Sequence, residues 1–126
     1  MRLPILIVAL SALVFAQDKI GAGTYKGAWT GASGGGDFHM TLRADGNGGL
    51  GADIGFTIEG QEVPSKVTSI KVSGASIEAV YEFDLQGNKL QSAIKGTLKG
   101  KTIEGTYKTT AGDSPVDEGT WKTTAQ

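Results

Sequence analysis

The sequence predicts an all-β protein: an antiparallel up-and-down β-barrel of about eight strands, with a two-sheet β-sandwich as the alternative. Three observations predict this fold class. From Thr24 onward, apolar residues alternate with polar ones at a period of two, as in strands that bury one face. Glycine-rich turns recur about every 10 to 14 residues. The chain also holds 20 glycines together with many Thr, Ile and Val residues, a composition that disfavours helices.

The first four predicted strands are defined by inward residues that alternate along them. With these residues in parentheses, the strands are Thr24–Thr30 (Tyr25, Gly27, Trp29), Asp37–Arg43 (Phe38, Met40, Leu42), Leu50–Ile58 (Leu50, Ala52, Ile54, Phe56, Ile58) and Val67–Val72 (Ile70, Val72). The segment from Glu59 to Ser65 is expected to be a loop. The Ser33-Gly34-Gly35-Gly36 run is interpreted as a flexible loop before the second strand.

The last four predicted strands follow the same rule. They are Ser76–Asp84 (Ile77, Ala79, Tyr81, Phe83), Lys89–Lys99 (Leu90, Ser92, Ile94, Gly96, Leu98), Thr102–Thr109 (Ile103, Gly105, Tyr107, Thr109) and Gly119–Thr124 (Gly119, Trp121). The opposite faces carry charged side chains on nearly every strand, so one face is core and the other meets water. Short consecutive hairpins make sequence neighbours pair, and closure of such a meander into a barrel removes its exposed edges.

The tight turns predict the register of the hairpins. Gly100-Lys101 is the size of a two-residue hairpin loop. It pairs Lys99 with Thr102, and further along it pairs Gly96 with Gly105. A slip of one residue would turn the lysines of this hairpin inward. The inward glycine pair is expected where a barrel strand bends sharply.

The chain begins with the layout of a secretory signal peptide. Arg2 supplies a positive charge, the stretch that follows is apolar, and small residues precede Gln17. Residues 1–16 are therefore predicted to be a signal peptide and residues 17–126 a single barrel-like domain, secreted or periplasmic. The apolar run is shorter than the ~20 residues that a membrane-spanning helix needs. Charges on the outward faces also argue against an outer-membrane barrel, so no membrane insertion is expected.

Composition excludes several functional classes. The chain has no cysteine, which removes disulfides, thiolate metal sites and cysteine nucleophiles. Its net charge is −1 and its lysines are interleaved with acids, so no nucleic-acid partner is expected. The segment Asp45–Gly49 resembles half of a calcium loop, but Phe56 stands where the bidentate Glu would be, and a turn is favoured. We expect no metal and no cofactor.

The single histidine is not expected to catalyse a reaction. His39 alternates out of phase with Phe38 and Met40, so it should face solvent beside Asp37. No serine or cysteine nucleophile is tied to it by a motif. We therefore expect no catalytic residues and no enzyme. The acidic segment around Asp113, Asp117 and Glu118 is interpreted as a solvated turn, although it could bind a cation or a basic partner.

The aromatic residues are the candidate ligand-binding site. All of them have inward parity, and inside a small barrel they could line a cavity whose Tyr hydroxyl and Trp N–H groups orient a bound molecule. The candidate residues are Tyr25, Trp29, Phe38, Tyr81, Phe83, Tyr107 and Trp121. The alternative is that these rings, with Phe56, simply fill the core, because eight-stranded barrels are often just wide enough for side chains.

The segment Gly27-Ala28-Trp29 resembles the start of the calycins, the group of barrels that includes lipocalins and avidins. These proteins open their first strand with Gly-x-Trp, and the stretch through Phe38 to Asp45-Gly46 is also similar to an avidin. The resemblance implies a barrel with an internal ligand site. The late arginine of lipocalins and the further tryptophans of avidins have no counterpart here, so biotin binding is not implied. The chain is also similar to uncharacterised exported bacterial β-proteins, which imply no function.

Two functional hypotheses follow. The first is an exported binding protein that holds a small, partly apolar ligand in the barrel interior. The second is a structural or protein-interaction domain, inhibitor-like, with a filled core and a protein partner bound through its loops. The interior discriminates between them, because a connected cavity of several hundred Å³ favours the first and a packed interior the second.

Overall fold

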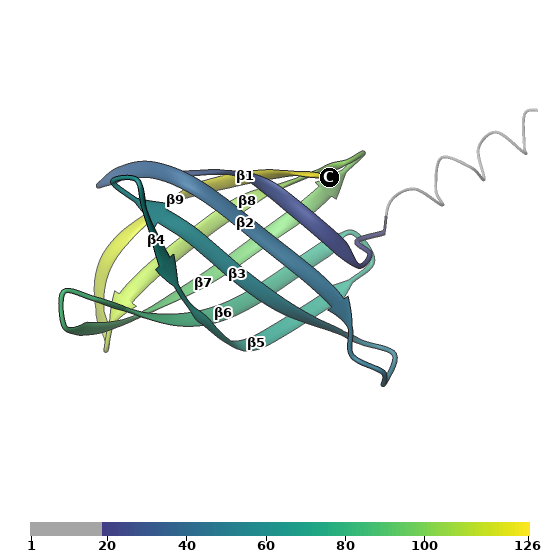
Figure 1. Cartoon of the computed structure of the whole chain (residues 1–126), viewed down its shortest axis with the longest axis horizontal. Coiled ribbons are helices and arrows are strands. Elements are labelled where there is room, and N and C mark those ends of the chain that lie inside the picture. Colours follow the sequence, from purple (N-terminus) through teal and green to yellow (C-terminus); the bar gives the residue numbers. More distant parts are fainter. Residues whose placement is uncertain (1–18) are drawn as a thin grey trace, which may run out of the picture.

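The described part of the protein is one curled antiparallel sheet of nine strands (Figure 1). The computed structural model describes residues 19–126, so the predicted signal peptide lies outside the described residues. The strands are β1 (Gly23–Gly31), β2 (Gly34–Ala44), β3 (Leu50–Ile58), β4 (Gln61–Pro64), β5 (Lys66–Ser73), β6 (Ser76–Leu85), β7 (Asn88–Lys99), β8 (Thr102–Ala111) and β9 (Ser114–Ala125). Their order in the sheet is β4-β3-β2-β1-β9-β8-β7-β6-β5. The predicted all-β, up-and-down antiparallel fold is confirmed.

The first and last strands of the meander pair with each other. Strand β1 is antiparallel to β9, and Trp29 lies directly opposite Trp121 in this pairing. All the remaining paired strands are consecutive in sequence. The β1–β9 ladder alone joins the two ends of the meander, and it thereby curls the sheet toward a barrel. The two predicted inward tryptophans therefore meet at the seam.

Strand β4 differs from the sequence prediction, which makes the segment from Glu59 to Ser65 a loop. Three of its four residues are exposed and only Val63 is buried. A single buried residue gives no alternation of apolar and polar positions, so the sequence does not reveal this strand. Ser65 alone separates β4 from β5, and β4 pairs with β3 while β5 pairs with β6. The two behave as one bent strand that changes partners at Pro64, a residue with no N–H to donate to a ladder. No ladder joins β4 to β5 within residues 19–126, so the expected full closure is replaced by two free edges there.

The register predicted around Gly100-Lys101 is confirmed. Lys99 pairs with Thr102 and Gly96 pairs with Gly105. Gly100 has a φ of 65°, the left-handed conformation that favours glycine. A Cβ on Gly105 would collide with the main-chain oxygen of Lys95. This inward glycine therefore permits a close approach of two backbones, which is the role expected of glycine where a barrel strand bends.

The inner face of the curled sheet is filled at one of its two ends. In an up-and-down sheet, successive turns lie at opposite ends. The β2–β3 and β7–β8 turns share one end, and Met40, Leu42 and Ile103 pack near it. Each of these three side chains is at most 1% exposed. Ile20, which precedes β1, is also buried there, and its N–H donates to the carbonyl of Gly74 at 2.9 Å. The interior is therefore packed at this end of the sheet. Within residues 19–126 no helix has the length and apolarity needed to cross a membrane.

Candidate functional site: an aromatic cavity at one end of the sheet

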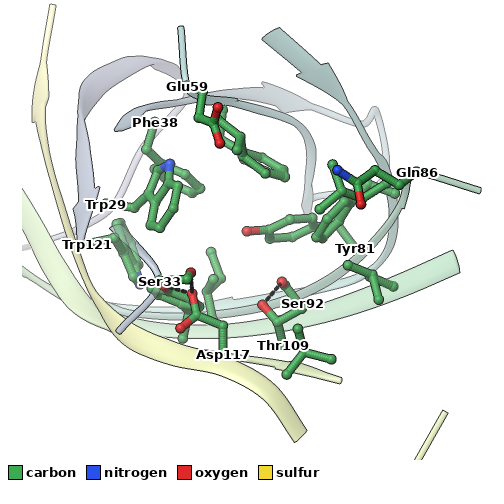
Figure 2. Close-up of a pocket in the computed structure, with 18 residues that line it drawn as sticks. Trp29, Ser33, Phe38, Glu59, Tyr81, Gln86, Ser92, Thr109, Asp117 and Trp121 are labelled. Atoms are coloured by element: carbon green, nitrogen blue, oxygen red, sulfur yellow. Dashed lines mark hydrogen bonds between the residues drawn. The ribbon is translucent and has the colours of Figure 1, made fainter. Parts of the chain in front are cut away.

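A cavity of about 320 Å³ opens at the end opposite the packed core. The turns β1–β2, β3–β4 and β6–β7 contribute Ser33, Glu59 and Gln86 to its lining, and the strands below contribute aromatic and aliphatic side chains. Figure 2 shows these side chains pointing from the surrounding strands toward a common space. The interior is thus packed at one end and hollow at the other.

Seven aromatic residues line the cavity, and their rings contact one another across the sheet. Trp29 and Tyr107 meet edge to face with ring centroids 6.0 Å apart, and the rings of Phe38 and Trp121 lie 5.3 Å apart. On the other side, Phe56 of β3 stands edge-on to Phe83 of β6 at 4.9 Å. Such pairs stabilise a structure by about 0.5–1.5 kcal/mol beyond their buried area. These contacts hold the rings in a fixed frame around the cavity.

Six of the seven residues predicted as a ligand site line this cavity. They are Trp29, Phe38, Tyr81, Phe83, Tyr107 and Trp121. Tyr25 is buried, as its inward parity predicts, but it does not line the cavity. Its hydroxyl donates to the carbonyl of Gly21 at 2.9 Å at the closed end of the sheet. Parity alone could not separate Tyr25 from the others, because it gives the face of a residue and not its height along the barrel.

Trp29 is fixed by its indole N–H, which donates to the carbonyl of Thr57 at 2.9 Å. Gly36 pairs with Trp29 across β1 and β2, and a Cβ on Gly36 would lie 2.8 Å from the indole nitrogen and collide with the Thr57 oxygen. The predicted flexible loop at Ser33–Gly36 is therefore wrong, because Gly34 to Gly36 belong to β2. The glycine at position 36 is explained by this close approach and not by flexibility.

A polar corner of the cavity is built by Tyr107, Asp117 and Ser33. The Tyr107 hydroxyl donates to Asp117 Oδ2 at 2.7 Å, and the Ser33 hydroxyl donates to the same oxygen at 2.9 Å. The second oxygen, Asp117 Oδ1, is shielded from solvent and has no hydrogen-bond partner within the described residues. A buried acceptor without a partner costs about 1–3 kcal/mol. The corner therefore contains one unpartnered carboxylate oxygen that protein atoms cover.

The corner keeps Asp117 charged. Burial raises the pKa of Asp117, but the hydrogen bonds from Tyr107 and Ser33 outweigh it and hold this pKa below its ordinary value. Burial, and then the bond and charge of Asp117, raise the pKa of Tyr107 well above its usual range. At neutral pH the corner is a carboxylate that accepts two hydrogen bonds, with Tyr107 as a neutral donor.

Two further hydroxyls line the wall. The hydroxyls of Ser92 and Thr109, from β7 and β8, hydrogen-bond to each other at 2.5 Å (Figure 2). Figure 2 also shows the Tyr81 hydroxyl directed into the open space. Burial raises the pKa of Tyr81 to about 12, and the nearby Ser92 hydroxyl opposes this rise only in part. These hydroxyls can donate to or accept from a bound molecule.

The rim carries the two non-glycine residues with positive φ among residues 19–126. Glu59 has a φ of 51° and Gln86 a φ of 53°, and each is followed by a glycine that also has positive φ. Both central residues of these two-residue turns are thus left-handed, as type I′ turns require. Asn, Asp and Gly suit that position, whereas a longer side chain costs about 1 kcal/mol or more there. Val116, another rim residue, is 51% exposed and is the only large exposed hydrophobic side chain in the described part.

His39 lies outside the cavity on the outer face, as its parity predicts. Its side chain is 43% exposed, and its Nε2 lies 2.8 Å from Glu62 Oε2. The partner comes from β4, the strand that the sequence does not predict, and not from Asp37. Gly55 lies between them in the sheet, and a Cβ there would collide with both side chains. Such an exposed pair contributes about 0–1 kcal/mol.

Sequence reasoning places Ser92 and Thr109 correctly on the inner face, but it misses the other four polar residues of the cavity, Ser33, Glu59, Gln86 and Asp117. Asp117 is predicted to be part of a solvated acidic turn, yet it lies in β9 with the same parity as Gly119 and Trp121. That parity was the available signal. A bulge hid it, because Thr109 pairs with Asp117 and Thr110 pairs with Pro115. Val116 is left as the extra residue, so the alternation breaks there. Ser33, Glu59 and Gln86 lie in turns, where period-two alternation assigns no face.

The structure offers no evident metal centre among residues 19–126, where no three His, Cys, Asp or Glu side chains gather closely enough to hold an ion. In the Asp45–Gly49 segment, Asp45 Oδ1 accepts hydrogen bonds from the main-chain N–H groups of Asn47 and Gly49 at 2.7 and 3.2 Å. This is an Asx turn. Neither a protein-family model, nor a curated protein, nor a solved structure matches the chain.

Proposed function

We propose that the protein is a binding protein that holds a small, partly apolar ligand in the cavity at the open end of its sheet. The observation that carries this proposal is the cavity itself. Its volume of about 320 Å³ falls within the ~300–1,000 Å³ typical of small-molecule sites, which are mostly apolar with a few convergent polar groups. A domain that acted only through its outer surface would gain stability by filling this space.

The composition of the rim supports the same proposal. Glu59 and Gln86 hold a strained backbone conformation at the mouth of the cavity, although Asn or Gly would relieve the strain. Strained residues gather at sites where their side chains act. Val116 adds an exposed apolar contact to the same rim.

We propose binding without catalysis. The histidine of the chain lies on the outer face and pairs with an exposed carboxylate. The hydroxyl of Ser33 donates to Asp117, whose pKa lies below its ordinary value, so this carboxylate is a weak base for activating a serine. The hydroxyl of Ser92 is paired with that of Thr109, which is no base. The groups that line the cavity are suited to hold a molecule.

We further propose that the protein is exported and that its barrel is calycin-like. The calycin proposal rests on Gly27-Ala28-Trp29 at the first strand and on the pairing of that strand with the last one. The export proposal rests on residues 1–16. Intact mass of the secreted protein should correspond to a chain that begins at Gln17. A full-length form recovered from the membrane fraction would contradict export.

The binding proposal is tested with N-phenyl-1-naphthylamine, an apolar dye whose fluorescence rises when it leaves water. The folded protein should bind this dye, and Ile58→Trp should weaken binding at least about tenfold, because the added ring occupies the space of the ligand. Leu50→Trp is the matched control. Both residues are half-buried ends of β3, but only Ile58 lines the cavity. The outer-face variant His39→Ala should also bind normally.

Equal weakening in the two tryptophan variants would contradict a site in the cavity. Native mass spectrometry of the protein purified from its own host adds a second measurement, in which we expect a co-purified small molecule. A bare protein that also fails to bind the dye would favour the structural or protein-interaction function instead.

A further inference from the structure

The walls of the cavity are unbalanced in charge. Among the residues that line it, Glu59 and Asp117 are acidic, and none is a lysine, an arginine or a histidine. A ligand anion would therefore find no counter-charge and would share the cavity with Asp117, which is partly buried, and with Glu59 at the exposed rim. Like charges repel, and the repulsion is stronger for the less solvated of the two carboxylates. This distribution selects against acids such as fatty acids and in favour of neutral or cationic molecules.

The charge of Asp117 distinguishes a cation from a neutral molecule. Its Oδ2 already accepts two hydrogen bonds, from Tyr107 and Ser33. Its Oδ1 accepts none within the described residues, but protein atoms cover it, so it presents no free acceptor to the cavity. Asp117 nevertheless lines the cavity. Its ionised carboxylate attracts a cation and gives a neutral molecule no such attraction.

Aromatic faces beside Asp117 add a second attraction for positive charge. The Tyr107 ring carries the hydroxyl that bonds Asp117, and Trp29 stands edge-on to that ring at 6.0 Å. Trp121 lines the same side of the cavity (Figure 2). The face of an indole or phenol ring attracts an ammonium group within about 6 Å. A carboxylate flanked by such rings is a chemical arrangement that recognises organic cations.

We propose that the ligand is an organic cation, a protonated amine whose nitrogen binds Asp117 and whose apolar body lies against the rings of the cavity. This inference deepens the proposed binding function and rests on it. Phe56, Phe83 and Leu90, on the side of the wall away from Asp117 in the sheet order, offer an apolar surface for the body. The structure therefore predicts selectivity for the charged amino group of the ligand and not for a particular apolar body.

The test uses three ligands that share one body and differ in charge: 4-phenylbutylamine, 4-phenylbutanol and 4-phenylbutyrate. Each is titrated calorimetrically and also competed against N-phenyl-1-naphthylamine at pH 7. The amine should bind about tenfold or more tighter than the alcohol, and the acid should bind most weakly. Asp117→Asn keeps the shape of the side chain and should reduce the amine–alcohol ratio to within about twofold. Glu118→Gln is the control, because it removes a neighbouring exposed charge that does not line the cavity.

A measurement on the unaltered protein guards against a variant that fails to fold. The amine should shift the carboxyl-carbon NMR resonance of Asp117, and the alcohol should shift it less. Dye binding with equal affinities for amine and alcohol, or an unchanged ratio in Asp117→Asn, would overturn the cation proposal while the binding function stands. Failure of the dye and all three ligands to bind would overturn both.

Discussion

Gly31 leaves open the space that the Tyr107 hydroxyl occupies, since a Cβ on Gly31 would collide with that oxygen and lie 2.8 Å from Asp117 Oδ2. Gly31→Ala should therefore push Tyr107 away from Asp117 and destabilise the fold by about 1–3 kcal/mol. The pKa of Asp117 should rise toward its ordinary value as a donor is lost. Urea unfolding and an NMR titration of Asp117 measure the two effects.

Gly51→Ala is the control for this prediction. A Cβ on Gly51 has nothing within 4 Å and its φ is not in the left-handed region, so the free energy of unfolding should change by no more than about 0.5 kcal/mol. An unchanged Asp117 titration in Gly31→Ala would show that Gly31 does not position the Tyr107 hydroxyl.

Gly105→Val should be far more damaging than Gly51→Val. The added side chain at Gly105 would meet the main chain of β7, including the Gly96 Cα at 2.6 Å. Backbone atoms cannot move aside as a flexible side chain can, so we expect a loss of about 3 kcal/mol or more. Gly60 is unsuitable as a control because its φ of 82° itself favours glycine. Similar urea midpoints for the two valine variants would mean that the β7–β8 register is wrong.

Gln86→Asn should stabilise the protein by up to about 1 kcal/mol. Gln86 has a φ of 53°, and asparagine tolerates this region better than glutamine. Gln91→Asn provides the comparison, since Gln91 is an exposed residue of β7, where asparagine is less favourable in a strand. Thermal midpoints should therefore move in opposite directions. A fall in both would indicate that the Gln86 side chain itself stabilises the rim.

The sequence predicts strand register best where a tight turn joins two strands in which apolar and polar residues alternate without interruption. The hairpin around Gly100 determines the partners of Gly96 and Leu98, because any slip exposes one set of side chains and buries the charged set. Alternation failed where strands are short or interrupted. Strand β4 has one buried residue, and the bulge at Val116 hid the inward position of Asp117.

The sequence permits a cavity but does not require one. Inward glycines and alanines among inward rings are compatible with a hollow interior and also with interdigitated packing. Gly96 shows the second outcome, since a Cβ there would lie 2.6 Å from the Trp121 ring. The rings nearer the open end leave space instead. Whether the interior is hollow or packed at a given height depends on the directions of the side chains across the barrel. Tertiary contacts such as the Trp29–Thr57 hydrogen bond set these directions.

Stability should fall at alkaline pH because of Tyr81. A tyrosine in the unfolded chain ionises near pH 10, whereas burial raises the pKa of Tyr81 to about 12 in the fold. Between these values the unfolded chain has lost the proton that the folded protein retains. The stabilisation present below pH 10 is therefore lost as pH rises toward 12, by about 2–3 kcal/mol. Urea unfolding at several pH values from 9 to 12 should give a flatter decline for Tyr81→Phe, and parallel declines would contradict the buried ionisation.

The two tryptophans should report folding and ligand binding differently. Trp121 is 2% exposed and donates its indole N–H to the Thr106 carbonyl at 3.1 Å, whereas Trp29 is only partly buried. Buried indoles emit at shorter wavelength than solvated ones, so unfolding should shift the emission of Trp29→Phe and Trp121→Phe to the red. 4-Phenylbutylamine should perturb the emission of Trp121→Phe more strongly, because that variant retains Trp29 beside the open space. An unfolding shift without any ligand response would describe a filled interior. Emission from the folded protein that matches free tryptophan in water would place both indoles outside, and the inward parity of β1 and β9 would then be wrong.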